Sequence, residues 1–303
     1  MRIALTGASG FIGSVVATTL HEAGHHVTGL VRETSRRDHI ERVIERFVVG
    51  EQADESCWPA LLEGNDVVVM NSVDWAPLKE HDLDRHLHSN LLASIRFLDA
   101  ARDAQQSRKI IFMSSVAVHH QIVDAWEGVV DETHPLRPNS LYGAYKAAVE
   151  AHLWQGYHEH GTPFAALRPA AVYGIDPHMT RSIGFPIIRS LRNGEPFTRA
   201  GGGKFVHVQD VADAVRACIE NDAVQAEVFN LADCYARWSD IAIMLKDILD
   251  LQDVTIDTSS PELSKNVFCK DRVRDTLGVQ LDRGHEGLKQ YLRELVDAVG
   301  VET

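Results

Sequence analysis

A glycine-rich turn near the start of the chain reads Thr6-Gly7-Ala8-Ser9-Gly10-Phe11-Ile12-Gly13. It directly follows an apolar run and opens an amphipathic segment, so a strand, a tight turn and a helix are expected in succession. In dinucleotide-binding proteins, glycines in this context let the chain turn sharply, let its backbone approach a pyrophosphate, and let helix and strand pack closely. The N–H groups at the helix N-terminus then bind the phosphates. The turn therefore predicts a dinucleotide site that contacts Gly7, Ser9, Gly10, Phe11 and Ile12.

The residues after the second predicted strand bear on which dinucleotide binds. An NAD site usually has Asp or Glu about 20 residues after the glycines, where the carboxylate accepts hydrogen bonds from the ribose. This chain has Arg32 there, with Arg36 and Arg37 soon after. Because a guanidinium forms charge-assisted, bidentate bonds with a phosphate, Arg32 favours NADP, which carries a 2′-phosphate, over NAD. Glu33 beside it leaves NAD open as the alternative.

Short apolar runs alternate with amphipathic segments in the first half of the chain, which is typical of β-α-β units around a parallel sheet. The run at residues 66–70 contains three consecutive valines, as expected of a strand buried on both faces. The pattern predicts an α/β fold with a Rossmann-type, doubly wound parallel sheet. Strands are expected at residues 3–5, 27–31, 47–49, 66–70, 109–113 and 164–167, and helices at about 11–23, 83–104 and 141–160.

The pattern changes after Gly174. Prolines and the run Gly201-Gly202-Gly203 interrupt it, so residues 175–204 are expected to form loops and a short helix. Residues 205–208 are expected to return to the sheet before a helix, and the chain after 238 to be mainly helical, with one strand near 254–256. We therefore predict a dinucleotide-binding domain of residues 1–174 plus about 205–235. A small, discontinuous C-terminal substrate lobe would comprise about 175–204 plus 236–303.

Tyr142 and Lys146 are four residues apart, a spacing that places both on one face of a helix. A lysine ammonium beside a phenol lowers the phenol pKa from its usual value of about 10, so the tyrosine exchanges protons nearer neutrality. Tyr145, next to Lys146 in the sequence, is expected to point elsewhere. Ser115 follows the fifth predicted strand, where its hydroxyl is placed to bond a substrate carbonyl or hydroxyl. The pattern predicts Tyr142 as a catalytic acid/base that acts with Lys146 and Ser115.

The composition argues against several classes of protein. The 303 residues include 30 Lys and Arg against 43 Asp and Glu, a formal charge of −13, whereas a nucleic-acid partner requires a basic surface. The four cysteines form no C-x-x-C pair, and the 16 histidines include no H-E-x-x-H, so neither disulfides nor a metal site is expected. No apolar run approaches the length of a membrane span, and Met1 leads directly into the first strand without a signal peptide. A cytoplasmic protein that acts on a small molecule is expected.

Together these motifs resemble the extended, NAD-dependent epimerase/dehydratase-like branch of the short-chain dehydrogenase/reductase superfamily, over nearly the whole chain. The resemblance rests on residues 6–13, Asn90, 114–118, 142–146 with Glu150, 167–174 and 205–210. It implies that Ser115, Tyr142 and Lys146 form the catalytic triad. It also implies that Tyr142 and Lys146 contact the cofactor, Lys146 through the nicotinamide ribose, and that Asn90 lies near the nicotinamide. Tyr142 would move a proton at the substrate oxygen while hydride passes between substrate carbon and nicotinamide.

Several positions depart from the pattern of this branch. Residues 115–117 lack the Thr-Asp-Glu of nucleotide-sugar dehydratases, so dehydration is not expected. Ala171 and Gly203 stand where sugar-nucleotide epimerases often have the Asn and Arg that serve the substrate diphosphate. The arginines that remain as alternative anchors are Arg181, Arg189, Arg192 and Arg199.

Three functions follow from these observations. The first is an NAD(P)-dependent oxidoreductase that acts on a carbonyl or secondary alcohol of a sugar-like or other small molecule. The alternative is a nucleotide-sugar epimerase with tightly bound NAD, and the most remote is a non-catalytic NADP-binding regulator, because fold does not dictate activity. The likeness also implies a homodimer formed through the helices at 83–104 and 141–160.

Overall fold

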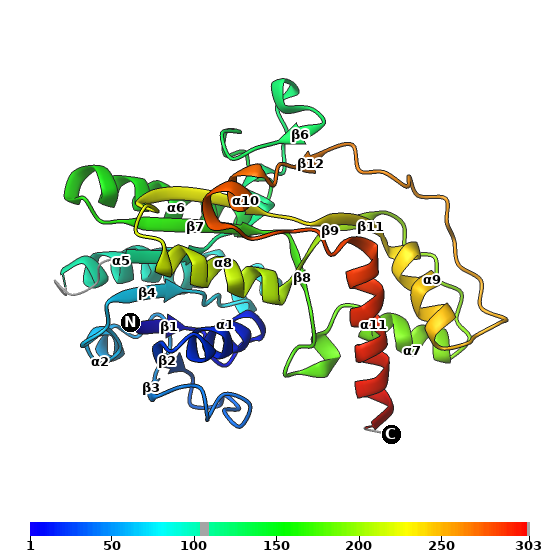
Figure 1. Cartoon of the computed structure of the whole chain (residues 1–303), viewed down its shortest axis with the longest axis horizontal. Helices are drawn as coiled ribbons and strands as arrows, with labels where there is room; N and C mark the ends of the chain where they lie inside the picture. Colours follow the sequence, from blue (N-terminus) through cyan, green and yellow to red (C-terminus); the bar gives the residue numbers. More distant parts are fainter. Residues whose placement is uncertain (104–108, 302–303) are drawn as a thin grey trace.

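Seven parallel strands form the central sheet of the computed structural model, which describes residues 1–103 and 109–301 (Figure 1). Their order is β10-β7-β5-β4-β1-β2-β3. The six strands expected from the sequence are all present, so the predicted doubly wound fold is confirmed. They are β1 (Arg2–Thr6), β2 (His26–Val31), β3 (Arg46–Val49), β4 (Val67–Met70), β5 (Lys109–Met113) and β7 (Phe164–Pro169).

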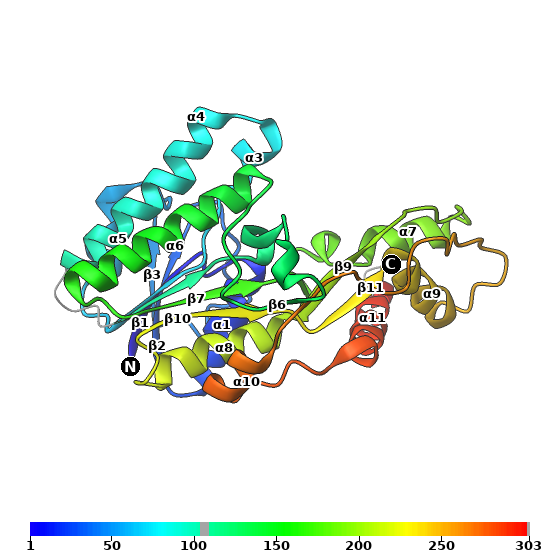
Figure 2. The ribbon, with the colours of Figure 1, turned by 90° about the horizontal axis from the view of Figure 1, so that it is seen from above.

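Helices cover both faces of this sheet. α1 (Phe11–Glu22) and α8 (Val208–Glu220) pack against each other on one face, while α2 (Trp58–Leu62), α5 (Ala93–Asp103) and α6 (Leu141–His160) lie on the other (Figure 2). Val67 and Val69 belong to the buried cluster of the first face, and Val68 to that of the second. Successive side chains of β4 thus point to opposite faces of the sheet. Because both faces are buried beneath helices, every residue of the strand is apolar, which explains the run of valines.

The glycine turn lies where the order of the sheet reverses. β1 is the strand between β2 and β4, and the turn begins where β1 ends at Thr6. In open parallel sheets, ligands bind outside the carboxyl ends of the strands at this switch point. The fold therefore places the predicted dinucleotide turn at the position that the topology favours for a ligand.

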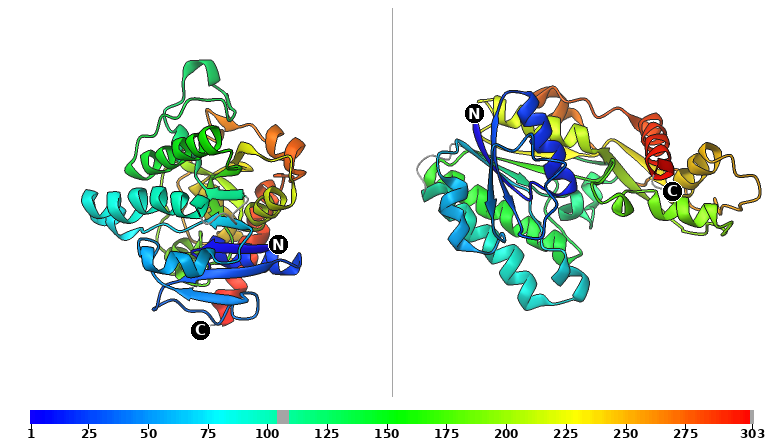
Figure 3. Two further views of the ribbon diagram at one scale, coloured as in Figure 1. Left: turned by 90° about the vertical axis from the view of Figure 1, so that its left-hand side faces the viewer. Right: turned by 90° about the horizontal axis from the view of Figure 1, so that it is seen from below.

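A second, smaller lobe contains the three-stranded sheet of β8 (Ala171–Tyr173), β9 (Gly202–His207) and β11 (Cys234–Arg237). α7 (Phe185–Arg192), α9 (Trp238–Ile248) and α11 (Gly284–Val301) surround its own buried cluster (Figure 3). The expectation that residues 205–208 return to the central sheet is wrong. β9 pairs with β8 and β11 instead, because Phe205 packs in the cluster of the small lobe while its neighbour Val206 packs in that of the central sheet. The seventh central strand is β10 (Ala226–Leu231), which the sequence analysis missed.

Two other expectations are corrected. The strand near 254–256 is a single bridge between Ile256 and Phe197. The helix expected at 83–104 is α4 (Leu83–His86), a π-helical turn η2 (Leu87–Leu92) and then α5; its expected end at Ala104 lies outside the described residues.

One segment of the C-terminal part lies away from the small lobe. α10 (Asp271–Leu277), expected in that lobe, packs on α8 and β10, and its Val273 joins the cluster of the central sheet. The remaining short elements are η1 (Glu55–Cys57), α3 (Ala76–Glu80), η3 (Val116–His119), η4 (Asp124–Trp126), β6 (Val129–Val130), η5 (Met179–Arg181) and β12 (Val267–Phe268). Among the helices of residues 1–103 and 109–301, none has the length and apolar character needed to cross a membrane.

Candidate functional site

The glycine turn has the geometry that a dinucleotide requires. Gly7 has a φ of +68°, which favours glycine, and a Cβ at Gly13 would lie 2.1 Å from the Gly7 carbonyl oxygen. α1 therefore packs so closely against the end of β1 that only glycine fits at position 13. No side chain caps α1 at Gly10, so the N–H groups of its first turn are free to bind an anion. These features fit a bound pyrophosphate.

The end of β4 supports this turn from the side. The backbone N–H groups of Asn71 and Ser72 donate to the Thr6 hydroxyl at 2.9 and 3.1 Å. A Cβ at Gly7 would meet the Ser72 hydroxyl at 3.0 Å, so the two loops are in direct contact. Asn71 and Ser72 thus form one wall of the predicted cofactor site.

Arg32 lies exposed at the end of β2. Arg36 is paired with Asp38 at 2.8 Å, and the Arg37 guanidinium lies over the Phe47 ring. In the part of the chain that the structure describes, no hydrogen bond or ion pair engages the Arg32 guanidinium. Arg32 is therefore available to a ligand at this end of the sheet.

His39 lies beside the glycine turn, and no sequence pattern pointed to it. Its Nε2 is 3.2 Å from the Ser9 carbonyl oxygen, while its buried Nδ1 has no hydrogen-bond partner among the residues that the structure describes. An imidazole held in this way can accept or donate one further hydrogen bond beside the turn.

Ser115, Tyr142 and Lys146 come together at the carboxyl end of β5. Ser115 caps η3 by accepting from Ala117 N–H at 3.2 Å, and Tyr142 and Lys146 lie in the first two turns of α6. Burial raises the pKa of Tyr142 to about 12, and its hydrogen bond with the Ser115 side chain acts in the opposite direction. The Tyr142 hydroxyl therefore stays protonated at neutral pH and is in the form that donates a proton.

The expected effect of Lys146 on Tyr142 is absent. The ammonium lies 5.7 Å from the centroid of the Tyr142 ring and donates instead to the Met113 carbonyl oxygen at 2.6 Å and to the Tyr145 hydroxyl at 3.4 Å. The expectation that Tyr145 points elsewhere is therefore also wrong. Burial lowers the pKa of Lys146 itself to about 7, against the attraction of Glu150, because a buried ammonium loses its hydration.

Asn90 holds the loop that follows β4. It is fully buried in the π-helical turn η2, where its Oδ1 accepts from Asp74 N–H at 2.8 Å and its Nδ2 donates to the Asp74 carbonyl oxygen at 2.9 Å. Its amide is therefore occupied by backbone, and proximity to the nicotinamide stays a prediction. Trp75, next along this loop, stacks on Tyr142 with ring centroids 5.0 Å apart.

A buried polar network of Glu150, Arg168 and His119 lies next to the site and connects α6, β7 and η3. Arg168 binds both oxygens of Glu150, at 3.0 and 2.6 Å, and its third nitrogen lies 2.8 Å from His119 Nε2. Ser114 also donates to Glu150. Burial and the Arg168 charge lower the pKa of His119 to about 3, so this imidazole is neutral and accepts from the guanidinium. Sequence patterns pointed to Glu150 and Arg168 only through the family likeness, and no pattern assigned a role to His119.

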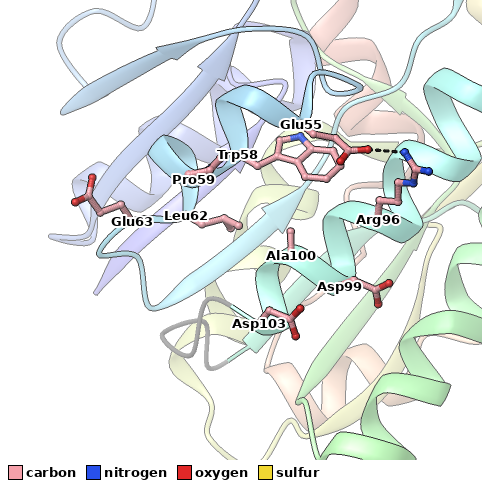
Figure 4. Close-up of a pocket in the computed structure, with 9 residues that line it drawn as sticks. All are labelled: Glu55, Trp58, Pro59, Leu62, Glu63, Arg96, Asp99, Ala100 and Asp103. Atoms are coloured by element: carbon pink, nitrogen blue, oxygen red, sulfur yellow. Dashed lines mark hydrogen bonds and ion pairs between the residues drawn. The ribbon is translucent and has the colours of Figure 1, made fainter.

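A cavity of about 690 Å³ lies elsewhere, between α2 and α5 (Figure 4). Trp58, Leu62 and Ala100 contribute apolar surface, and an ion pair of 2.6 Å joins Arg96 to Glu55. None of the predicted site residues lines it. Within residues 1–103 and 109–301 no group of three or more His, Cys, Asp or Glu side chains is placed to hold a metal ion.

Comparison with known proteins gives the site its context. The sequence model of the NAD dependent epimerase/dehydratase family matches residues 3–232. The chain belongs to this family. A UDP-glucose 4-epimerase of Mycolicibacterium smegmatis is 30% identical over 231 residues, covering 72% of this chain and 73% of that protein. A ketoreductase of Aspergillus fumigatus is 23% identical over 332 residues, covering 97% of this chain and 96% of its own.

Solved structures agree on the fold. The UDP-glucose 4-epimerase of Thermus thermophilus, solved in complex with NAD, superimposes with a TM-score of 0.79 at 20% identity and covers 97% of this chain and 99% of its own. The predicted membership of the epimerase/dehydratase-like branch is confirmed, and with it the prediction of an NAD(P)-dependent enzyme.

Two family positions that serve a substrate diphosphate in many epimerases differ here. Ala171 begins β8 and Gly203 lies in β9, and neither carries a polar side chain. Of the alternative arginines, Arg199 is stacked on Trp238 at 3.6 Å. Arg181, Arg189 and Arg192 are exposed on η5 and α7.

Proposed function

We propose that this protein is an NADP(H)-dependent oxidoreductase that interconverts a carbonyl group and a secondary alcohol on a small molecule. The observation that carries the proposal is the convergence of Ser115, Tyr142 and Lys146 at the carboxyl end of β5, where the Lys146 ammonium lies 5.7 Å from the centroid of the Tyr142 ring. The pyrophosphate would bind at Gly7, Ser9, Gly10, Phe11 and Ile12, with Arg32 at the adenosine end.

The residues have separate roles in this proposal. Ser115 and Tyr142 hold the substrate oxygen, and in reduction the oxygen takes the Tyr142 proton while its carbon gains hydride. A dinucleotide bound at the glycine turn would supply or accept that hydride. The positive charge of the Lys146 ammonium stabilises the resulting Tyr142 phenolate until the phenolate regains a proton from solvent. The Glu150–Arg168 pair keeps Ser114, next to Ser115, in place.

A nucleotide-sugar epimerase is the second candidate, and the name of the Mycolicibacterium relative favours it. Against it stand Ala171 and Gly203, which offer no side chain to a diphosphate. The ketoreductase relative, which is similar over almost the whole chain, supports reduction with exchange of the cofactor in each turnover.

One assay separates the two. The purified protein is mixed with NADPH or NADH and a panel of ketones, and nicotinamide absorbance is followed. We expect ketone-dependent loss of absorbance. In parallel, UDP-glucose is incubated with the protein without added cofactor. Formation of the 4-epimer there, with no ketone turnover, would establish the epimerase instead.

Arg32 provides a prediction about the cofactor. Arg32→Glu is expected to weaken NADPH binding by about 10- to 100-fold, because a hydrogen bond to a charged group contributes roughly 1.5–3 kcal/mol. NADH affinity should change little, since its ribose has no phosphate. Dissociation constants from nicotinamide fluorescence measure both. Arg42→Glu, the same charge reversal at another exposed arginine of this segment, is the control. Equal weakening in both variants, or a wild type that prefers NADH, would contradict the assignment.

We also propose a homodimer that forms through the helices of the site. Exposed apolar side chains follow α4, η2 and α6, with Leu83 at 49%, Leu87 at 42% and Leu141 at 43% exposure. Large apolar side chains gathered on neighbouring elements are typical of an interface. Light scattering is expected to give twice the chain mass of 33.6 kDa, and Leu87→Arg to shift it toward the single chain. A wild-type mass of one chain would rule the dimer out.

The four cysteines support the proposed cytoplasmic location. All are free thiols, and Cys57 and Cys218 are buried in the core. Free thiols are typical of a reducing compartment.

A further inference from the structure

Trp75 is a large apolar side chain left half exposed next to the proposed acid/base. Its exposure is 50%, although its indole stacks on the Tyr142 ring at 5.0 Å with an angle of 25° between the planes. Because Tyr142 covers one face of the indole, the exposed surface belongs to the other face and the edges. The edge of the indole is thus exposed beside the Tyr142 hydroxyl, whereas its free face is turned away from the Tyr142 ring.

The loop that carries Trp75 is held firmly. Asn90 binds both backbone groups of Asp74, and the Asp74 carboxylate accepts from Ala76 N–H at 3.1 Å and pairs with Arg85 at 3.4 Å. Asn90 reaches this loop from the π-helical turn η2, a distortion that occurs frequently at functional sites. A side chain fixed before the ligand arrives loses little entropy on binding. The exposed indole is therefore preorganised.

The charges around the indole determine which kind of ligand group can bind next to it. Asp74 lies directly beside it, and the Arg85 guanidinium is shared between Asp74 and Glu80, at 3.4 and 3.5 Å. A phosphate next to Trp75 would therefore face a carboxylate rather than an unpaired cation. A neutral aromatic group meets no such penalty and gains an edge-to-face contact with the exposed edge of the indole.

We propose that Trp75 determines specificity through an edge-to-face contact between its exposed edge and an uncharged aryl group attached to the substrate carbonyl. The inference rests on the proposed function, because it places the carbonyl oxygen at the Tyr142 hydroxyl. The group next to that carbonyl then lies alongside the indole that covers the phenol. The substrate class is an aryl ketone or the corresponding benzylic alcohol.

The test uses two ketones of similar size, phenyl methyl ketone and cyclohexyl methyl ketone, with NADPH. The wild type is expected to have the higher kcat/KM for the phenyl compound. Trp75→Leu should reduce that preference by about three- to tenfold, through KM, since an aromatic pair adds roughly 0.5–1.5 kcal/mol beyond its buried area. Trp75→Phe should keep the preference within about twofold, because it retains an aromatic ring. Trp154→Leu, at another tryptophan exposed to 38%, is the matched control and should change nothing.

A second readout needs no turnover. Saturation-transfer NMR of 1-phenylethanol is expected to show ring protons in contact with the wild type, and this signal should disappear in Trp75→Leu and persist in Trp154→Leu. If no carbonyl compound is reduced but the ring signal depends on Trp75, the proposed function fails and the aryl site stands. If ketones are reduced and Trp75→Leu affects both equally, or if the ring signal survives in Trp75→Leu, the aryl site is overturned.

Discussion

Tyr142→Phe is expected to lower kcat for carbonyl reduction by about 10²- to 10⁴-fold, the range that a positioned general acid contributes. The variant removes one oxygen atom from a side chain that is otherwise held by its ring, which stacks on Trp75. It deletes the proton donor and the hydrogen bond with Ser115 while leaving the backbone of α6 unchanged. Steady-state assays with saturating NADPH measure the loss, and fluorescence titration should give a dissociation constant within about twofold of the wild type.

Tyr145→Phe is the matched control for this experiment. It removes the same atom from a neighbouring residue, whose hydroxyl contacts Lys146 at 3.4 Å but is fully buried behind the site. Its effect on kcat should be far smaller than that of Tyr142→Phe. A Tyr142→Phe enzyme that keeps its rate, or a larger loss in Tyr145→Phe, would show that Tyr142 is not the proton donor.

The parts of the molecule that local chemistry controls were predictable from the sequence. The glycine turn follows a strand and opens a helix, and both neighbours are recognisable from a few residues. β4 is recognisable because a strand covered on both sides must be apolar throughout. By contrast, β9 and β10 cannot be assigned to a sheet from their own residues, since each has only a few apolar side chains. Phe205 of β9 packs in the small lobe, whereas Phe229 of β10 packs against the central sheet.

In the site, the sequence supplied residue types but not the direction of each side chain. The spacing of Tyr142 and Lys146 placed both on one helical face, yet the ammonium binds the Met113 carbonyl, which the fold brings from β5. Asn90 was expected near the cofactor, but the π-helical turn directs its amide to Asp74. Such outcomes depend on contacts between elements far apart in the sequence, and a motif does not contain them.

The buried Lys146 provides the second large effect, in which activity and stability change in opposite directions. The folded protein lowers the pKa of Lys146 to about 7 from its usual 10.5, so the unfolded chain binds more protons between these values. Stability should therefore rise as the pH increases from about 7 toward 10.5, and the full cost of burying the ammonium is present below pH 7.

Lys146→Met, which keeps a long unbranched chain without the charge, is expected to abolish detectable turnover and to stabilise the cofactor-free protein at pH 6. The lowered pKa makes burial of the ammonium costly at pH 6, by several kcal/mol, which exceeds the about 1–3 kcal/mol lost with the bond to the Met113 carbonyl, so a net stabilisation is expected. Urea unfolding at pH 6 and pH 9.5 measures it, and the gain should shrink at the higher pH.

Lys109→Met separates this effect from the simple removal of a buried lysine. Lys109 is also buried, which lowers the pKa of its ammonium, but it donates to two carbonyl oxygens, those of Cys218 and Asn221, at 2.9 and 2.8 Å. Its replacement removes the ammonium from both carbonyl oxygens, although that of Asn221 still accepts from Val224 N–H at 3.1 Å, and should destabilise the protein while the site stays intact. Two results would show that burying the Lys146 ammonium does not lower the stability of the protein. One is that Lys146→Met, like Lys109→Met, is less stable than the wild type at pH 6. The other is that the stability gained by Lys146→Met is the same at pH 6 and pH 9.5. The stabilising outcome would mean that the fold tolerates a strained buried charge because the reaction at Tyr142 needs it there.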